Sequence, residues 1–257
     1  MKPIEVLYLA GPGPESEILY HALASRFFIP LVIQEAPRSR LKLLERRLRR
    51  QGLRKTLGQV AFQTGLVPLL RKKGAPRIKE ILKSQGLRTG PMDQSHIEEV
   101  SSLNSEMARR ILARRRPDMV VINGTSILSK ETLKKLSAPV LNTHVGITPQ
   151  YRGVHGGYWA LRNRDWERFG VTVHLVDPGI DTGVILAQAL CESTESDNFS
   201  TYPYLQLARG IPVLIDVIQQ LHEGRAQRQE CDPSGTPLWS HPTIFEYLQG
   251  RLLEGVR

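Results

Sequence analysis

Two stretches in the middle of the chain decide how the rest of it is interpreted. Residues 139–153 read PVLNTHVGITPQYRG, and residues 170–183 read GVTVHLVDPGIDTG. Each begins as a short apolar run and continues into a segment with Gly or Pro, the pattern of a β-strand that leads into a loop. Asn142 and His144 stand two residues apart in the first run, so on an extended backbone their side chains point to the same side.

The polar side chains at these strand ends suit the transfer of an acyl group to an amine. The amide of Asn142 can donate to a carbonyl oxygen as it becomes an oxyanion, and such a donor is worth roughly 3–4 kcal/mol of the barrier. A protonated His144 can stabilise the same oxygen and pass a proton to the leaving nitrogen. The Asp181 carboxylate can orient the imidazole or accept the proton that the amine loses, which is worth about 10²–10⁴ in rate. The structural alternatives are a capping Asn, a packed His and a turn Asp.

The combination of these motifs resembles the formyltransferases that use 10-formyltetrahydrofolate. That family includes glycinamide ribonucleotide, methionyl-tRNA and sugar-nucleotide formyltransferases. The matching motifs are N-T-H from Asn142, Y-R-G from Tyr151 and D-T-G from Asp181, in this order, and the resemblance covers roughly residues 100–225. It implies that Asn142, His144 and Asp181 are catalytic, that 10-formyltetrahydrofolate is the co-substrate, and that no metal is used.

The resemblance also implies which residues bind the co-substrate. In this family the loop after a buried strand, here the run at residues 119–123, helps to wall the folate pocket mainly with backbone groups. The candidates lie in this loop and in the turn before Asp181: Asn123, Gly124, Ile127, Asp177 and Gly179.

Four further side chains near the motifs have competing interpretations. Tyr151 and Arg152 are candidates for substrate binding, and for Arg152 a salt bridge that anchors the loop is the alternative. His155 is expected to be a loop residue, because no metal-ligand spacing surrounds it. His174 is expected to be packed and hydrogen-bonded rather than catalytic.

The turn after the first predicted strand argues against a simple ribose-phosphate substrate. In the glycinamide enzymes of the family, the corresponding turn holds a phosphate with glycines, a serine and free N–H groups. Here Pro12 and Pro14 each lack an N–H, and Glu15 repels phosphate. We therefore expect this turn to be structural, with a helix beginning at about Glu17.

Composition excludes several classes of protein. Two cysteines without CxxC spacing, Cys191 and Cys231, argue against a disulfide framework and a zinc site and suit a reducing cytoplasm. The first ten residues carry Glu5 and predict a strand instead of a signal peptide. No apolar run approaches the roughly 20 residues of a membrane-spanning helix. We therefore expect a cytoplasmic protein.

The positive charge is concentrated in one segment. From Arg38 to Arg88 there are sixteen Lys or Arg residues and two acids, a net charge of +14, whereas the whole chain carries +10, so the other residues sum to −4. This imbalance predicts a local anionic partner. Helical spacing of leucines begins at Leu41, and residues 56–70 carry no charge.

This basic insertion, about residues 38–90, has three interpretations. A basic amphipathic hairpin with an uncharged centre suits peripheral contact with the inner face of a membrane through residues 40–75. An ordinary helical insertion with a solvated basic face and a buried apolar face has the same pattern. A collar for an anionic substrate is the third. Phe62 is the one aromatic residue of the segment, which argues against nucleic acid as a partner.

The alternation of strands and helices predicts an α/β fold, doubly wound and Rossmann-like, with the site at the carboxyl ends of the strands. We expect a formyltransferase catalytic domain over residues 1–225, with the basic helical insertion inside it, and a short C-terminal tail over residues 226–257. The tail is too short for the tRNA-binding domain of the methionyl-tRNA enzymes. Nothing in the sequence predicts an oligomeric state.

The predicted activity is the transfer of the formyl group of 10-formyltetrahydrofolate to a primary amine, on a nucleotide- or lipid-linked amino sugar. One alternative is a hydrolase of the same co-substrate, in which water replaces the amine. The other is a membrane-surface binding module in which the catalytic fold is idle.

Overall fold

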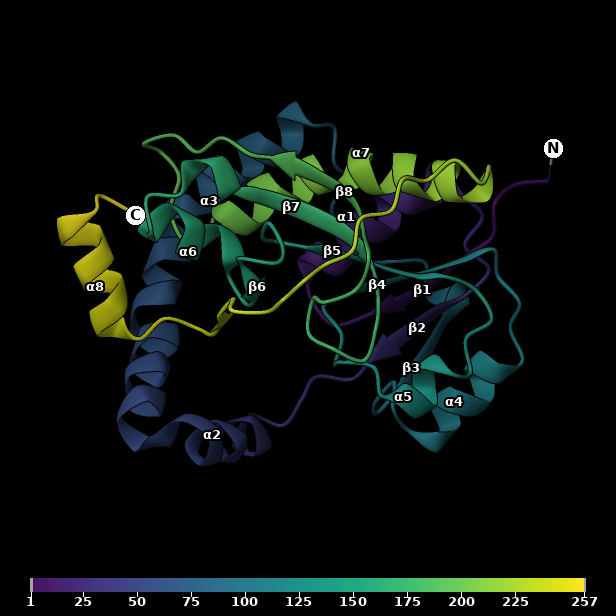
Figure 1. Cartoon of the computed structure of the whole chain (residues 1–257), viewed down its shortest axis with the longest axis horizontal. Coiled ribbons are helices and arrows are strands. Elements are labelled where there is room, and N and C mark those ends of the chain that lie inside the picture. Colours follow the sequence, from purple (N-terminus) through teal and green to yellow (C-terminus); the bar gives the residue numbers. More distant parts are fainter. Residues whose placement is uncertain (1, 257) are drawn as a thin grey trace.

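The predicted doubly wound α/β fold is confirmed by the computed structural model, which describes residues 2–256 and all of their side chains except that of Lys42. A seven-stranded sheet with the order β3-β2-β1-β4-β5-β7-β8 lies between helices (Figure 1). The strands of this sheet are β1 (Val6–Ala10), β2 (Val32–Glu35), β3 (Ile97–Val100), β4 (Met119–Asn123), β5 (Val140–His144), β7 (Gly170–Leu175) and β8 (Ile185–Leu190). The helices are α1 (Pro14–Ala24), α2 (Arg40–Ala61), α3 (Val67–Ser84), α4 (Glu106–Ala113), α5 (Lys130–Leu133), α6 (Gly156–Arg162), α7 (Tyr202–His222) and α8 (Ile244–Leu253).

The winding of the sheet reverses between β1 and β4. From β1 the parallel strands continue outward to β2 and β3, and the chain then returns to place β4 and β5 on the other side of β1. In open α/β sheets, ligands bind at this reversal, outside the carboxyl ends of the strands. β7 and β8 extend the sheet beyond β5 as antiparallel strands.

Both faces of the sheet are buried, which explains the nearly continuous apolar runs of its strands. Along β1, Val6 and Tyr8 belong to the hydrophobic cluster that contains residues of α1 and α7. Leu7 and Leu9 point the other way, into the cluster that contains residues of α4. This alternation of sides follows from the two-residue period of a strand.

One predicted boundary near the N-terminus was wrong. The first helix begins at Pro14 and not at Glu17, because the N–H that proline lacks is one that the first helical turn leaves unpaired anyway. The second strand, β2, begins at Val32, although the apolar run starts at Phe27. Pro30 lies before β2 and has no N–H to offer a neighbouring strand.

The basic insertion is helical from residue 40 to residue 84, so the predicted helical insertion is confirmed, and the hairpin among its three interpretations is not formed. α2, a π-helical turn (Phe62–Leu66) and α3 follow one another without a reversing loop. The one bend inside α2 lies at Gly52, whose positive φ of 78° suits glycine. None of the helices in the described part of the chain is long and apolar enough to cross a membrane.

One face of the uncharged centre of the insertion is buried inside the protein. Thr56, Gln59 and Phe62 are fully or almost fully covered. The Phe62 ring meets the rings of Phe199 and Tyr247 at centroid distances of 4.9 and 5.0 Å. The interpretation with a buried apolar face is therefore confirmed for this centre, whereas the basic ends are exposed.

The C-terminal tail is packed against the insertion and against the loop after β5. A short strand β9 (Leu238–Trp239) pairs with β6 (Arg152–Gly153), and α8 follows along α2 at one end of the molecule (Figure 1). The division into residues 1–225 and 226–257 stays a prediction.

Phe62→Ala is expected to destabilise the protein by about 3–5 kcal/mol, because it empties a fully buried aromatic site. Denaturant unfolding measures the loss. The matched control is Leu57→Ala on the exposed side of the same helical insertion, which should change stability by no more than about 0.5 kcal/mol. Equal effects of the two substitutions would contradict the burial of the uncharged centre.

Candidate active site

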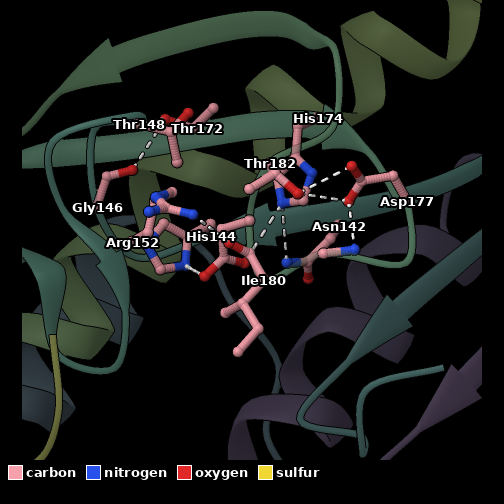
Figure 2. A network of polar contacts seen from close by, with 12 residues as sticks. Asn142, His144, Gly146, Thr148, Arg152, Thr172, His174, Asp177, Ile180 and Thr182 are labelled. Atoms are coloured by element: carbon pink, nitrogen blue, oxygen red, sulfur yellow. Dashed lines mark hydrogen bonds and ion pairs between the residues drawn. The ribbon is translucent and has the colours of Figure 1, made fainter. Parts of the chain in front are cut away.

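The three predicted catalytic residues come together at the carboxyl end of β5. Asn142 and His144 lie on β5, and Asp181 lies in the loop after β7, the antiparallel neighbour of β5. The Nδ1 atom of His144 is 3.4 Å from Oδ2 of Asp181. Figure 2 shows the side chains of Asn142 and His144 among those of His174 and the following loop.

His144 is held by its own loop as well as by Asp181. The ring is buried, and its Nε2 lies 2.7 Å from the backbone oxygen of Tyr151. Since a carbonyl oxygen only accepts, Nε2 carries the proton and donates it. The other ring nitrogen, Nδ1, then faces the carboxylate, so the imidazole lies between an acceptor on one side and a negative charge on the other.

This contact requires a glycine at position 146. A Cβ atom at Gly146 would lie 2.4 Å from the Tyr151 oxygen and 2.8 Å from Nε2 of His144. No side chain fits there without breaking the bond between them. Thr172 on β7 fixes the same loop, because its hydroxyl donates to the Gly146 oxygen and accepts from the Thr148 N–H.

Asp181 is a charged group with several partners in a mostly buried place. Burial alone would raise its pKa, but His144, the side chain of His174 and the N–H of Gly153 outweigh burial and bring the pKa down to about 2. The Gly153 N–H donates to Oδ2 at 2.9 Å, and His174 Nε2 lies 3.6 Å from Oδ1. The carboxylate is therefore ionised at neutral pH and joins β5, β6 and β7.

His174 belongs to the site, although the sequence placed it as a packed residue. It is buried and hydrogen-bonded as expected, but its partners are site residues. Its Nδ1 donates to the Leu175 oxygen at 2.8 Å, which leaves Nε2 to accept from the Asn142 amide at 3.2 Å. His174 thus orients Asn142. The two residues are register partners on β5 and β7, and the sequence does not reveal that register.

The loop after β4 carries three of the predicted co-substrate residues, Asn123, Gly124 and Ile127. It lies beside β5, at the carboxyl end of β4. Asn123 accepts a hydrogen bond from Ser16 through Oδ1 at 3.0 Å and so ties this end to α1. Gly124 follows with a positive φ of 65°. Ile127 is exposed, and its backbone oxygen accepts from the Asn104 amide. These positions suit a pocket wall, and their binding role stays a prediction.

Glu35 is a second residue that sequence reasoning missed. It ends β2, is buried, and accepts from the backbone N–H of Ser126 at 2.7 Å and from that of Leu103 at 3.1 Å. Burial would raise its pKa, but these bonds lower it. Glu35 therefore fixes the loop after β4, which carries the candidates Asn123, Gly124 and Ile127. Asn104 also holds this loop, because its Oδ1 accepts from the Ser129 N–H at 2.7 Å.

Asp177 shapes the loop between β7 and Asp181, which carries the other two predicted co-substrate residues, Asp177 and Gly179. Both carboxylate oxygens of Asp177 accept from the Thr182 hydroxyl at 2.8 Å, and Oδ1 also accepts from the Gly179 N–H at 3.0 Å. Asp177 and Gly179 therefore form the turn that carries Asp181. Their role in binding a co-substrate stays a prediction.

The two substrate-binding candidates are placed differently. The Tyr151 side chain is buried, donates to Asp165 and stacks on Trp239, so only its backbone oxygen faces the site. Arg152 donates to the backbone oxygens of Ile180 and Thr236 at 3.4 and 3.3 Å. It anchors the loop, as the alternative interpretation expected, although through carbonyl groups instead of a salt bridge.

Comparison with known proteins identifies a shared family. The sequence profile of the family described as Formyl transferase matches residues 67–212, more than half of the chain. The methionyl-tRNA formyltransferase of Thermodesulfovibrio yellowstonii is 31% identical over 157 residues, which are 58% of this chain and 46% of that one. The GDP-perosamine N-formyltransferase of Brucella melitensis is 30% identical over 125 residues, 48% of each chain. The chain spans about half the length of the curated relatives it matches.

Solved structures share the fold. An N-formyltransferase from Helicobacter canadensis, solved in complex with folinic acid and dTDP-3-aminofucose, superposes with a TM-score of 0.55 and 17% identity. The match covers 91% of this chain and 70% of that one. At this identity the likeness establishes the fold alone.

Asp181→Asn is expected to remove a stabilising charge worth on the order of 2 kcal/mol. The folded pKa of about 2 lies below the ~3.9 of an unfolded Asp. The carboxylate therefore stabilises the fold above pH ~4, and this contribution is lost as the pH falls toward 2. Denaturant unfolding should show a difference between wild type and variant that shrinks with acid. Asp216→Asn on the exposed side of α7 is the control, and an acid dependence unchanged by Asp181→Asn would contradict the assignment.

Proposed function

Because the chain belongs to the formyl transferase family, we propose that it is an N-formyltransferase that moves the formyl group of 10-formyltetrahydrofolate to a primary amine. The observation that carries this proposal is the contact of His144 with Asp181 beside Asn142, at the end of the sheet where α/β folds bind ligands. In the reaction, one C–N bond forms to the amine, one C–N bond to the folate breaks, and a proton moves between the two nitrogens.

The polar groups of Asn142 fit the formyl group of the co-substrate. One amide hydrogen is directed to His174. Within the described residues, the second amide hydrogen and Oδ1 have no protein partner. The second hydrogen is therefore free to donate to the formyl oxygen as negative charge develops there. His174 holds the amide in place before the substrates bind, so no energy is spent on orienting it during the reaction.

His144 supplies a mobile proton next to this donor. Its Nε2–H is directed to a neutral carbonyl oxygen. An oxyanion is a stronger acceptor than a neutral carbonyl. A substrate oxygen or nitrogen that gains negative charge within reach of the ring therefore competes with Tyr151 for this proton. The contact to Asp181 keeps the ring oriented and stabilises its positive charge.

Asp181 acts mainly through its charge. A carboxyl group with a pKa of about 2 is a weak base at neutral pH. It is thus better suited to stabilising the imidazolium and the positive charge on the attacking amine than to keeping a proton. This differs in emphasis from the expectation that Asp181 is the final proton acceptor.

We infer that the amine is carried by an amino sugar. The turn after β1 supports this assignment, because Glu15 and Pro14 occupy the first turn of α1, where a phosphate would otherwise be held by N–H groups. Relatives that act on amino sugars, such as the Brucella melitensis GDP-perosamine enzyme, are similar to this chain. Peripheral contact of residues 40–75 with an anionic surface also stays a prediction, and nucleic acid remains the less suitable partner.

The activity is tested by following tetrahydrofolate release from 10-formyltetrahydrofolate in the presence of different amines. The panel contains UDP-, GDP- and dTDP-linked amino sugars, glycinamide ribonucleotide and methionyl-tRNA. Release with an amino sugar alone is expected. Release with glycinamide ribonucleotide or methionyl-tRNA alone would contradict the assignment of the amine. Loss of the co-substrate without any amine would point to hydrolysis, and no loss with any partner would point to an idle site.

Asn142→Ala is expected to lower kcat by about 10²–10³, because it removes a donor to the developing oxyanion. The tetrahydrofolate-release assay described above measures the loss of kcat. Gln220→Ala removes a surface amide on α7 and serves as the control. Unchanged kcat in the Asn142 variant would show that the formyl oxygen is stabilised elsewhere.

A further inference from the structure

The C-terminal helix α8 presents an apolar stripe to the solvent. Phe245, Leu248 and Leu252 are spaced by three and four residues, so they lie along one side of the helix. Their exposed fractions are 77%, 40% and 80%. Tyr247 and Gly250, on the opposite side, are buried. The side that faces the protein is therefore already packed, and the stripe needs a different partner.

α8 is attached to α2, which also carries exposed apolar side chains. The backbone oxygen of His241, just before α8, accepts from the Gln59 amide at 2.7 Å. A Cβ atom at Gly58 would lie 2.9 Å from Thr243, so the two segments touch closely there. Elsewhere on α2, Leu53 and Leu57 are one helical turn apart and are 62% and 57% exposed.

The exposed part of α2 around these leucines is basic. Five exposed, positively charged side chains lie close to the Gly52 bend, three before it and two after it. Glu45 is the one acid of α2. We give the name α2–α8 surface to ten of the exposed apolar and basic side chains on these two helices: Arg46, Arg49, Arg50, Leu53, Arg54, Lys55, Leu57, Phe245, Leu248 and Leu252.

We propose that the α2–α8 surface binds an anionic lipid bilayer, with its apolar side chains among the acyl chains near the headgroups and its basic side chains on the lipid phosphates. Helices that lie in a membrane interface combine these two features. The surface differs from the contact expected through residues 40–75, because one face of the uncharged centre of that segment is buried and α8 supplies further apolar side chains.

Charge decides between lipid and the other occupants. A second copy of the chain would bring two arginine-rich surfaces together, and their repulsion opposes such a dimer. The core of a protein interface is usually depleted of charged residues, whereas here the basic side chains are interleaved with the leucines of α2. The headgroup plane of an anionic membrane offers phosphates and apolar chains side by side, and each basic side chain near it strengthens binding about fivefold.

The test is sedimentation of the full chain with phosphatidylcholine vesicles, with and without about 30% phosphatidylglycerol. Binding is expected with the anionic vesicles, to fall as salt is raised, and to be weak with phosphatidylcholine alone. No binding to the anionic vesicles, or equal binding to both kinds, would overturn the proposal.

Paired variants separate the two contributions. The double substitution of Phe245→Ser and Leu252→Ser should weaken binding about tenfold or more, and Met107→Ser, an exposed apolar residue on α4, is its control. The double substitution of Arg50→Gln and Arg54→Gln should weaken binding about 20-fold, whereas Lys134→Gln with Lys135→Gln removes the same charge beside α5. Full binding by both double variants of the α2–α8 surface would overturn the proposal.

Sedimentation velocity of the same proteins tests whether the α2–α8 surface binds a second copy of the chain instead. A concentration-dependent dimer that Phe245→Ser and Leu252→Ser abolish would assign the surface to a second copy and overturn the proposal. Formyl transfer to a soluble amine should be the same in these variants as in the wild type, because the substituted residues lie outside the site. The membrane surface therefore stands or fails independently of the proposed reaction.

Discussion

The antiparallel pairing of β7 with β5 is the constraint on which the site depends. The five strands before it are parallel and end at one edge of the sheet, so they bring loops together there. β7 runs the other way, places His174 opposite Asn142, and its following loop brings Asp181 to His144. Because β7 is antiparallel, the loops at this edge of the sheet are joined by an ordered set of hydrogen-bond donors and a carboxylate.

The charge state of the site follows from the burial of Asp181 among its hydrogen-bonding partners. A single carboxylate, Asp181, lies between two imidazoles and accepts one backbone N–H. Since its partners outweigh the cost of burial, the carboxylate stays ionised. One ring orients the Asn142 amide, and the other carries a proton toward a weak acceptor. The site is therefore organised before any substrate arrives, which is the condition under which fixed dipoles lower a barrier most.

The sequence predicted the parts of this arrangement that are local and missed those that depend on strand register. A spacing of two residues on one strand suffices to predict that Asn142 and His144 share a side, and the resemblance to a family added Asp181. His174 and Glu35 gain their roles from strands and loops that are distant in sequence. In the insertion, helical periodicity was visible, but the sequence left open whether the uncharged stretch is the centre of a hairpin or a helix with a buried face. Whether such a stretch bends or packs is decided by aromatic residues far along the chain, at positions 199 and 247.

The C-terminal tail contributes to the site through the loop that holds His144. Trp239 accepts from the Val154 N–H, donates to the Gln150 oxygen and stacks on Tyr151. These contacts fix the backbone on both sides of the carbonyl group that binds His144 Nε2. The insertion in turn holds the tail, since the side chain of Gln59 donates to the backbone oxygen of His241. The chemistry at β5 and the surface on α2 and α8 are thus joined by a continuous set of contacts.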